Sequence, residues 1–142
     1  MAREEFEEIV ETFEFLDDWE DRYRHVIEMG KAMPDMDDSQ KSALTKVDGC
    51  VSQVWIAPTI EGTGADQRLL FIGDSDAMIV KGLIAILRAL LDGETPKTIA
   101  STDVTAELGR LGLDQHLSAQ RSNGLKAMVM RLHQLAKAAE AA

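Results

Sequence analysis

The residue of this chain best suited to chemistry is its only cysteine, Cys50, in the stretch VDGCVSQVW at residues 47–55. A thiol is a nucleophile only as the thiolate, and its ordinary pKa is about 8.5, so its surroundings decide its reactivity. Gly49 allows a positive φ or a close backbone approach, and Ser52 and Gln53 offer hydrogen bonds nearby. A lone cysteine can equally be a small buried apolar side chain. The local stretch by itself leaves both interpretations open.

The three histidines are the next candidates for catalysis, and they are far apart at His25, His116 and His133. His116 lies in the polar segment DQHLSAQRSNG and would be the best base for a Cys–His pair with Cys50. A surface or helix-capping role explains His116 more simply, because nothing in the sequence brings it to the thiol. The sequence therefore favours the simpler role.

Motifs for metals and nucleotides are missing from the sequence. Structural zinc needs four closely spaced Cys or His ligands, and there is no C-x-x-C or H-x-x-x-H pair. A single cysteine cannot hold an iron–sulfur cluster alone. Neither a P-loop nor a G-x-G-x-x-G motif is present. We therefore expect no metal and no cofactor on this chain.

The composition excludes several classes of partner. Fifteen Lys and Arg against 25 Asp and Glu give a formal net charge of -10, which would repel nucleic acid, although an acidic face could dock on a basic protein. The N-terminus has no basic region followed by an apolar run, so it does not resemble a secretory signal. The longest apolar stretch, IVKGLIAILRALL, is too short to span a bilayer. We expect a soluble cytoplasmic protein, and its single cysteine fits a reducing compartment.

The first third of the chain has helical periodicity. Apolar residues line one face of residues 4–16, and the spacing restarts over residues 17–33, where Asp17 and Glu20 suit a capping box. Pro34 should end the second helix. Residues 34–46 are polar and acidic and are predicted to form a loop with at most one helical turn.

The pattern changes to that of strands after residue 46. Residues 51–57 and 68–73 are rich in β-branched and large apolar residues and are predicted as two strands. The loop between them carries Pro58, Gly62 and Gly64. A short extended piece at residues 46–48 is a candidate third strand.

Helical spacing returns from Asp74. Asp74, Ser75 and Asp76 are candidate N-caps of an almost uniformly apolar helix that stops at Gly93 and should be the central core helix. Shorter helices follow from Pro96 and over residues 104–113, then a last helix capped by Ser118 or Ser122 with a frayed alanine-rich end. We expect one α+β domain over residues 1–142, with N-terminal helices at 3–33, the sheet and cysteine loop at 46–73, and the core and C-terminal helices at 74–140.

Three segments in order resemble the SufE family of sulfur acceptors that work with cysteine desulfurases. VDGCVSQVWI matches its G-C-x-S-x-V-W signature, GDSDAMIVKGLIAIL follows at residues 73–87, and LDQHLSAQRSNGLKAMV at 113–129 fits H-L-(T/S)-x-x-R-x-x-G-L. The match covers roughly residues 20–135. Two departures are Val51, where glutamine is common, and a slightly longer turn near EGTGADQ, and neither replaces the cysteine.

The resemblance implies an α+β fold related to IscU-type scaffolds, with a small antiparallel sheet packed on several helices. It also implies a role as an accessory sulfur-transfer protein rather than an enzyme. Cys50 would take persulfide sulfur from a pyridoxal-phosphate-dependent cysteine desulfurase, stimulate that desulfurase and pass the sulfur to an iron–sulfur assembly scaffold. A lone cysteine suits this role, because a second thiol would resolve the persulfide to a disulfide and release sulfide.

The remaining motif residues are supporting or partner-facing candidates. Asp74 and Asp76 would cap the core helix and order the neighbouring cysteine loop, while His116 and Arg121 would lie near the partner-facing surface. Arg121 would pair with an acidic partner group or hold a thiolate. Capping and internal salt bridges are the alternatives for all four. Gly49 and Ser52 complete the set.

Two other functions stay open at this point. One is a redox-sensing domain whose Cys50 is oxidised or glutathionylated, and the other is an interaction module with an inert Cys50. The sequence does not decide whether the protein is a monomer or a homodimer.

Overall fold

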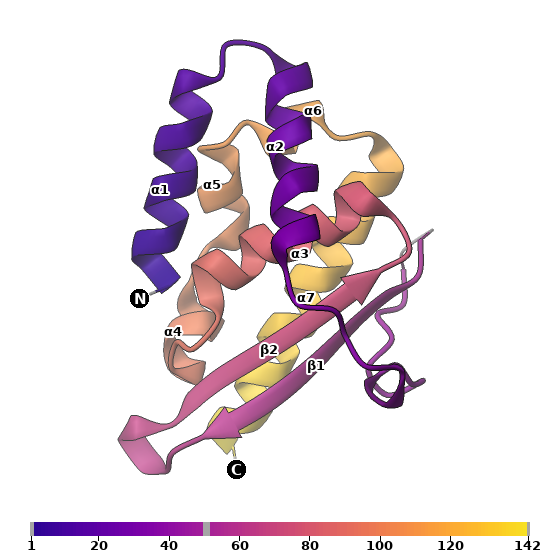
Figure 1. Ribbon diagram of the computed structural model, residues 1–142. Helices are drawn as coiled ribbons and strands as arrows, with labels where there is room; N and C mark the ends of the chain where they lie inside the picture. The colour runs from indigo at the N-terminus through magenta and orange to yellow at the C-terminus, as the bar shows by residue number, and fades with distance from the viewer. Residues whose placement is uncertain (1, 50–51, 142) are drawn as a thin grey trace.

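The computed structural model describes residues 2–49 and 52–141 and shows helices packed around a two-stranded antiparallel sheet (Figure 1). Cys50 and Val51 lie outside the described residues. The expected α+β class is confirmed. In chain order the elements are α1 (Ala2–Phe15), α2 (Trp19–Ala32), the 3₁₀ turn η1 (Asp38–Gln40), β1 (Val54–Glu61), the 3₁₀ turn η2 (Gly64–Asp66), β2 (Arg68–Ser75), α3 (Met78–Leu91), α4 (Pro96–Ser101), α5 (Val104–Gly109), α6 (Leu113–His116) and α7 (Ala119–Ala141).

The first two helices form an antiparallel pair that covers α3. The predicted capping box at Asp17 is wrong by one residue. Asp18 is the N-cap of α2, and its side chain accepts a hydrogen bond of 2.9 Å from the amide of Asp21. Two consecutive aspartates offer the same cap, and starting the helix at Trp19 packs that ring edge-on against Phe13.

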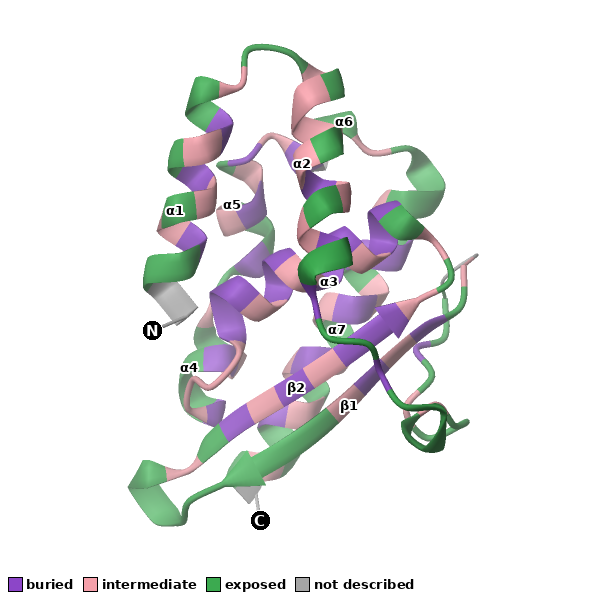
Figure 2. Cartoon of the chain, viewed as in Figure 1, coloured by how far each residue is buried: buried purple, intermediate pink, exposed green. Residues whose placement is uncertain are grey.

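The two strands pair from Val54↔Ser75 to Glu61↔Arg68. Both end later than predicted, and β1 begins at Val54, because Ser52 and Gln53 are not part of the strand. β1 continues through Pro58. The amide of Ile56 points away from β2 and donates to the carbonyl of Thr45, and the backbone nitrogen of Pro58, two residues later, points the same way. The missing N–H of Pro58 therefore removes no bond to β2. The part of β1 from Thr59 to Glu61 is exposed, whereas Leu69 of β2, which pairs with Ile60, is fully buried (Figure 2).

The helix α3 is the centre of the core, as its composition predicts. It lies between the sheet and the first two helices, and ten of its 14 residues are buried (Figures 1 and 2). Its tightest contact is the crossing with α2, where a Cβ added to Gly82 would overlap the carbonyl oxygen of Val26. Only a residue without a side chain fits this position.

The C-terminal helices differ from the prediction in two places. The predicted helix over 104–113 is divided into α5 and α6, because Gly112 takes a φ of +73° that interrupts the helix. The alanine-rich end of α7 does not fray. It is helical to Ala141, since alanine favours helix and Ala136 is fully buried. Ser118 caps this helix as predicted, with Oγ accepting from the amide of Arg121 at 3.3 Å.

Candidate functional site

We call residues 48–53, the stretch of the sequence that contains Cys50, the cysteine loop, and the structure describes residues 48, 49, 52 and 53 of it. Its base is closed by hydrogen bonds from the amide of Val47 to the carbonyl of Val54 and from the amide of Ile56 to the carbonyl of Thr45, both 2.8 Å. The candidate third strand is reduced to a single bridge between Lys46 and Trp55. The two sides of the loop are thus joined, although this bridge does not extend the sheet.

Gly49 takes the positive φ that its position before the thiol suggests. Its φ is +93°, and a Cβ added there would lie 3.4 Å from the Cβ of Ala127 in α7. A side chain at position 49 would be strained by this backbone conformation. Gly49 therefore both turns the chain and brings the loop against α7.

Asp76 fixes the other side of the cysteine loop. Its carboxylate accepts a 3.0 Å hydrogen bond from the amide of Gln53, and its own amide donates to the carbonyl of Gln53 at 3.3 Å. The expected capping role is wrong, because the N-cap of α3 is Ala77, with no side-chain bond to the helix. Residues 74–76 still complete the extended chain of β2 and its exit, which leaves the carboxylate of Asp76 facing Gln53. The expectation that Asp76 orders the cysteine loop agrees with these bonds.

Arg131 supports the same loop from α7, and sequence reasoning missed it. Its guanidinium donates to the carbonyls of Leu44 and Lys46 at 3.2 and 2.6 Å. Nothing in the local sequence distinguishes this arginine from a solvated one, since its partners lie more than 80 positions away. Arg131 and Asp76 together hold both chains that lead into the loop.

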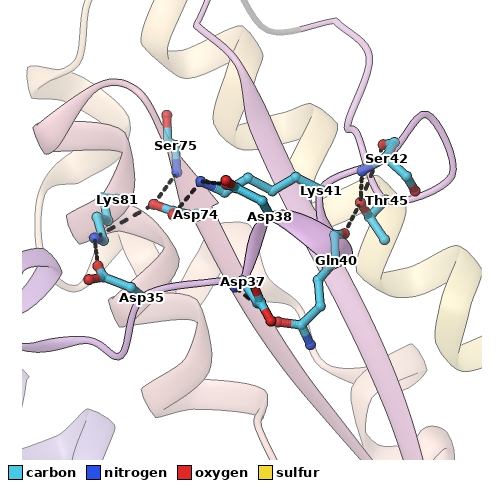
Figure 3. A network of polar contacts seen from close by, with 10 residues as sticks. All are labelled: Asp35, Asp37, Asp38, Gln40, Lys41, Ser42, Thr45, Asp74, Ser75 and Lys81. Atoms are coloured by element: carbon cyan, nitrogen blue, oxygen red, sulfur yellow. Dashed lines mark hydrogen bonds and ion pairs between the residues drawn. The ribbon is translucent and has the colours of Figure 1, made fainter.

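Asp74 lies behind the loop in a network of charges rather than at a helix N-cap. Its side chain is only 10% exposed and contacts Lys41 at 3.1 Å and Lys81 at 3.6 Å (Figure 3). It accepts a 2.8 Å bond from the amide of Ser75, and Lys81 also contacts Asp35 at 3.0 Å. Its position in β2, opposite Trp55, removes it from the helix terminus. The network ties the loop before the cysteine loop to β2 and α3.

In this network the carboxylate of Asp74 and the ammonium group of Lys81 stabilise each other's charged form. Burial acts to raise the pKa of the Asp74 carboxyl, but the Ser75 hydrogen bond, the hydrogen bond from Lys41 and the charge of Lys81 outweigh it and hold the pKa below the ordinary 3.8. The hydrogen bond to Asp35 raises the pKa of Lys81 above its ordinary value against the opposing effect of burial. The carboxylate and ammonium forms are therefore the stable ones near neutrality.

A small pocket of about 210 Å³ joins the cysteine loop to the start of α7. Ser52 lines it together with Arg121 and Ser118, and Val80 and Met128 supply apolar walls. Arg121 is exposed, and its guanidinium has no ion pair within residues 2–49 and 52–141. The structure therefore brings Ser52 and Arg121 to one place, with an arginine available for an anionic group.

His116 lies elsewhere. Its ring stacks on Trp19 at a centroid distance of 3.8 Å, and its Nδ1 lies 3.0 Å from the carbonyl oxygen of Gly112. The hydroxyl of Tyr23 donates to the carbonyl of His116. His116 is not among the residues that line the pocket of Ser52 and Arg121. These contacts give it a packing role between α2 and α6.

The described residues lack both a metal-binding cluster and a membrane-spanning helix. Nowhere in residues 2–49 and 52–141 do three or more His, Asp or Glu side chains group so that they could hold a metal ion. None of the described helices combines the length and the apolar character needed to cross a membrane.

Comparison with known proteins gives consistent matches over nearly the whole chain. Residues 7–136 match the SufE family model, whose description is Fe-S metabolism associated domain. An uncharacterized SufE-like protein of Rhizobium meliloti (strain 1021) is 45% identical over 126 residues, which cover 89% of this chain and 90% of the relative. Another, from Rhizobium etli, is 46% identical over 136 residues, covering 96% and 92%.

A solved structure has the same fold at low sequence identity. The solution structure of a hypothetical protein from Thermus thermophilus superposes with a TM-score of 0.77 at 21% identity, covering 100% of both chains. At this identity the match concerns the fold alone.

Proposed function

The chain belongs to the SufE family, whose domain is associated with Fe-S metabolism, and from this premise we propose that it carries sulfur as a persulfide on Cys50. The resemblance read from three sequence segments is thereby confirmed at the level of the family. The sulfur-carrier role, the desulfurase partner and the site residues belong to the proposal.

The proposed reaction is the transfer of one sulfur atom between two cysteines. The Cys50 thiolate attacks the outer sulfur of a persulfide on a cysteine desulfurase, and a new S–S bond forms at Cys50 as the S–S bond of the desulfurase breaks. The electron pair of the broken bond leaves on the desulfurase thiolate, and the proton of the persulfide stays on the transferred sulfur. The step needs no external oxidant or reductant.

The onward transfer repeats the same chemistry. A nucleophilic thiolate on an iron–sulfur assembly scaffold attacks the outer sulfur of the Cys50 persulfide and releases the Cys50 thiolate. The pyridoxal phosphate of the desulfurase produces the first persulfide, so this chain needs no cofactor of its own. A reducing compartment such as the cytoplasm keeps the thiol available.

The observation that carries the proposal is the support of the cysteine loop. In the sequence the sole cysteine lies between two segments that the structure describes, and these are joined at Val47 and Val54 and bonded to Asp76 and Arg131. A carrier must present the same thiol to two different partners, which a loop on a fixed base allows. Ser52 and Arg121 in the adjoining pocket are suited to hold a thiolate or persulfide anion.

The test is a transfer assay with a cysteine desulfurase and free cysteine. Mass spectrometry of the intact protein should show one added sulfur atom, and peptide mapping should locate it on Cys50. The Cys50→Ser variant should stay unmodified. A wild-type protein that gains no sulfur, or a Cys50→Ser variant that gains as much, would refute the proposal.

A peroxide arm separates the carrier from a redox sensor. A sensor should form a sulfenic acid or a mixed disulfide with glutathione in the absence of any desulfurase. At the same protein concentration, a carrier should be persulfidated by the desulfurase, whereas dilute peroxide should leave most of its Cys50 thiol unmodified. A Cys50 that reacts with neither is the inert residue of the third hypothesis.

A further inference from the structure

A second surface lies in a groove between α5 and α7, which shares Leu125 with the small pocket lined by Ser52 and Arg121. Its volume is 720 Å³, within the range of about 300–1,000 Å³ typical of binding pockets. Leu108 and Leu125 form an apolar floor, and Met130, which is 62% exposed, forms part of one wall. The proposed sulfur chemistry uses none of these residues.

The α7 side of the groove follows a regular helical pattern. Lys126, Met130, His133 and Lys137 all line the groove, at spacings of four, three and four residues. These positions lie along one face of the helix over three turns. The groove is therefore elongated, and Met130 on the face of α7 that borders it is exposed to solvent.

A positive charge stands at each end of this face. Lys126 and Lys137 are both exposed and are eleven residues apart, about 16 Å along the helix axis. Neither forms an ion pair in the part of the chain that the structure describes. Two unpaired cations on a chain with a net charge of -10 mark this face as a site for an acidic partner.

From this geometry we propose that the groove binds an amphipathic helix of a partner protein. That helix carries carboxylates about three turns apart, one for Lys126 and one for Lys137, with apolar side chains between them for the floor at Leu108 and Leu125. Helix-in-groove binding of this kind uses anchors at i, i+3, i+4 and i+7.

Two other occupants fit less well. A small molecule with one carboxylate would meet only one of the two lysines and leave the other uncompensated. A second copy of the chain that pairs groove to groove would bring lysines toward lysines, and each copy carries a net charge of -10.

The experiment uses the full-length protein and a fluorescent 20-residue helical peptide rich in Ala. The peptide carries Glu at positions 5 and 16 and Leu at positions 9 and 12, and a matched peptide has Lys in place of both Glu. Fluorescence anisotropy should show that the Glu peptide binds more tightly than the Lys peptide, against the net charge of the protein. Circular dichroism should first show that both peptides have equal helicity.

Charge reversal tests the two lysines directly. Lys126→Glu combined with Lys137→Glu should weaken binding of the Glu peptide by about tenfold and make the Lys peptide the tighter ligand, as expected for two exposed ion pairs. Lys31→Glu combined with Lys97→Glu, two exposed sites away from the groove, changes the net charge equally and should preserve the preference for the Glu peptide.

The proposal is overturned by any of four results. These are no measurable binding of the Glu peptide, equal binding of both peptides, displacement of the Glu peptide by dodecanoate below its micelle concentration, and a dimer in analytical ultracentrifugation that the charge reversal at Lys126 and Lys137 abolishes. Persulfide transfer to Cys50 should be unaffected by the charge reversal, so a failure here is distinguishable from a failure of the proposed carrier role.

Discussion

Asp74→Asn is the substitution that most directly tests the charge network behind the cysteine loop. Asparagine keeps the shape of the side chain, and its carbonyl can still accept the hydrogen bond from the amide of Ser75. What it loses is the negative charge that faces Lys41 at 3.1 Å and Lys81 at 3.6 Å. The substitution therefore isolates the contribution of the two ion pairs.

The magnitude follows from burial. Fully exposed ion pairs contribute about 0–1 kcal/mol, and removing one partner of a buried pair costs about 3–5 kcal/mol. The side chain of Asp74 is 10% exposed, whereas those of Lys41 and Lys81 are 26% and 19% exposed and reach water in part. Lys81 also keeps its contact with Asp35. About 1 kcal/mol for each pair gives an expected loss of about 2 kcal/mol at pH 7.

The pH dependence has a definite sign. Because the pKa of Asp74 is lower in the folded state than its ordinary 3.8, its contribution is fully present above 3.8 and is lost as the pH falls through the folded pKa. The pKa of Lys81 is raised, so its contribution is present below 10.5 and is lost as the pH rises through the folded value. Asp74→Asn should therefore remove the part of the pH dependence of stability at acidic pH that comes from Asp74.

The assay is urea unfolding followed by circular dichroism, repeated from pH 7 down to pH 2. The stability difference between wild type and Asp74→Asn should shrink as the pH falls below 3.8. Asp35→Asn is the matched control, because Asp35 contacts the same Lys81 but its side chain is 88% exposed, and we expect a loss below about 1 kcal/mol. A loss at Asp74 no larger than at Asp35, or a difference that does not change with pH, would refute the reasoning.

Three further substitutions test the packing around the site. Gly82→Ala should destabilise the fold by about 3 kcal/mol in urea unfolding, because the added methyl would meet the carbonyl of Val26 and force α2 and α3 apart; a change below about 1 kcal/mol would contradict the close crossing. Gly49→Ala should slow persulfide transfer to Cys50 by more than the accompanying loss of folding stability explains, since φ at position 49 is +93°. Equal transfer rates in wild type and variant would argue against a required turn. Arg131→Met keeps the apolar stem but leaves the carbonyls of Leu44 and Lys46 without their donor. Amide hydrogen exchange around residues 44–47 should therefore rise by about tenfold. Unchanged exchange there would show that Arg131 does not support this segment.

Local chemistry explains what could be predicted about the site. A glycine before Cys50 suggested a positive φ, and Gly49 has one. Ser118 or Ser122 was expected to cap the last helix, and Ser118 does so. Both properties depend on a residue and its near neighbours, which a sequence shows directly. The same holds for the almost uniformly apolar stretch between Asp76 and Gly93, which predicted the buried helix α3.

Predictions failed where two candidates were locally equivalent. Asp17 and Asp18 offer the same N-cap, and Asp74, Ser75 and Asp76 precede the core helix alike. Pairing of β2 with β1 as far as Ser75 kept residues 74–75 extended, so the helix began later and its N-cap fell on Ala77. The three polar side chains then took other partners.

The sequence by itself determined the family, the class of fold and the position of the sole cysteine, because these depend on residue types and on spacing along the chain. Tertiary structure decided the partners: Asp76 with Gln53, Arg131 with Leu44 and Lys46, and Asp74 with Lys41. It also brought Ser52 and Arg121 to one pocket and stacked His116 on Trp19. The physical reason is that a charge or hydrogen-bonding group acts over only a few ångströms, and packing of the whole chain sets which groups come that close.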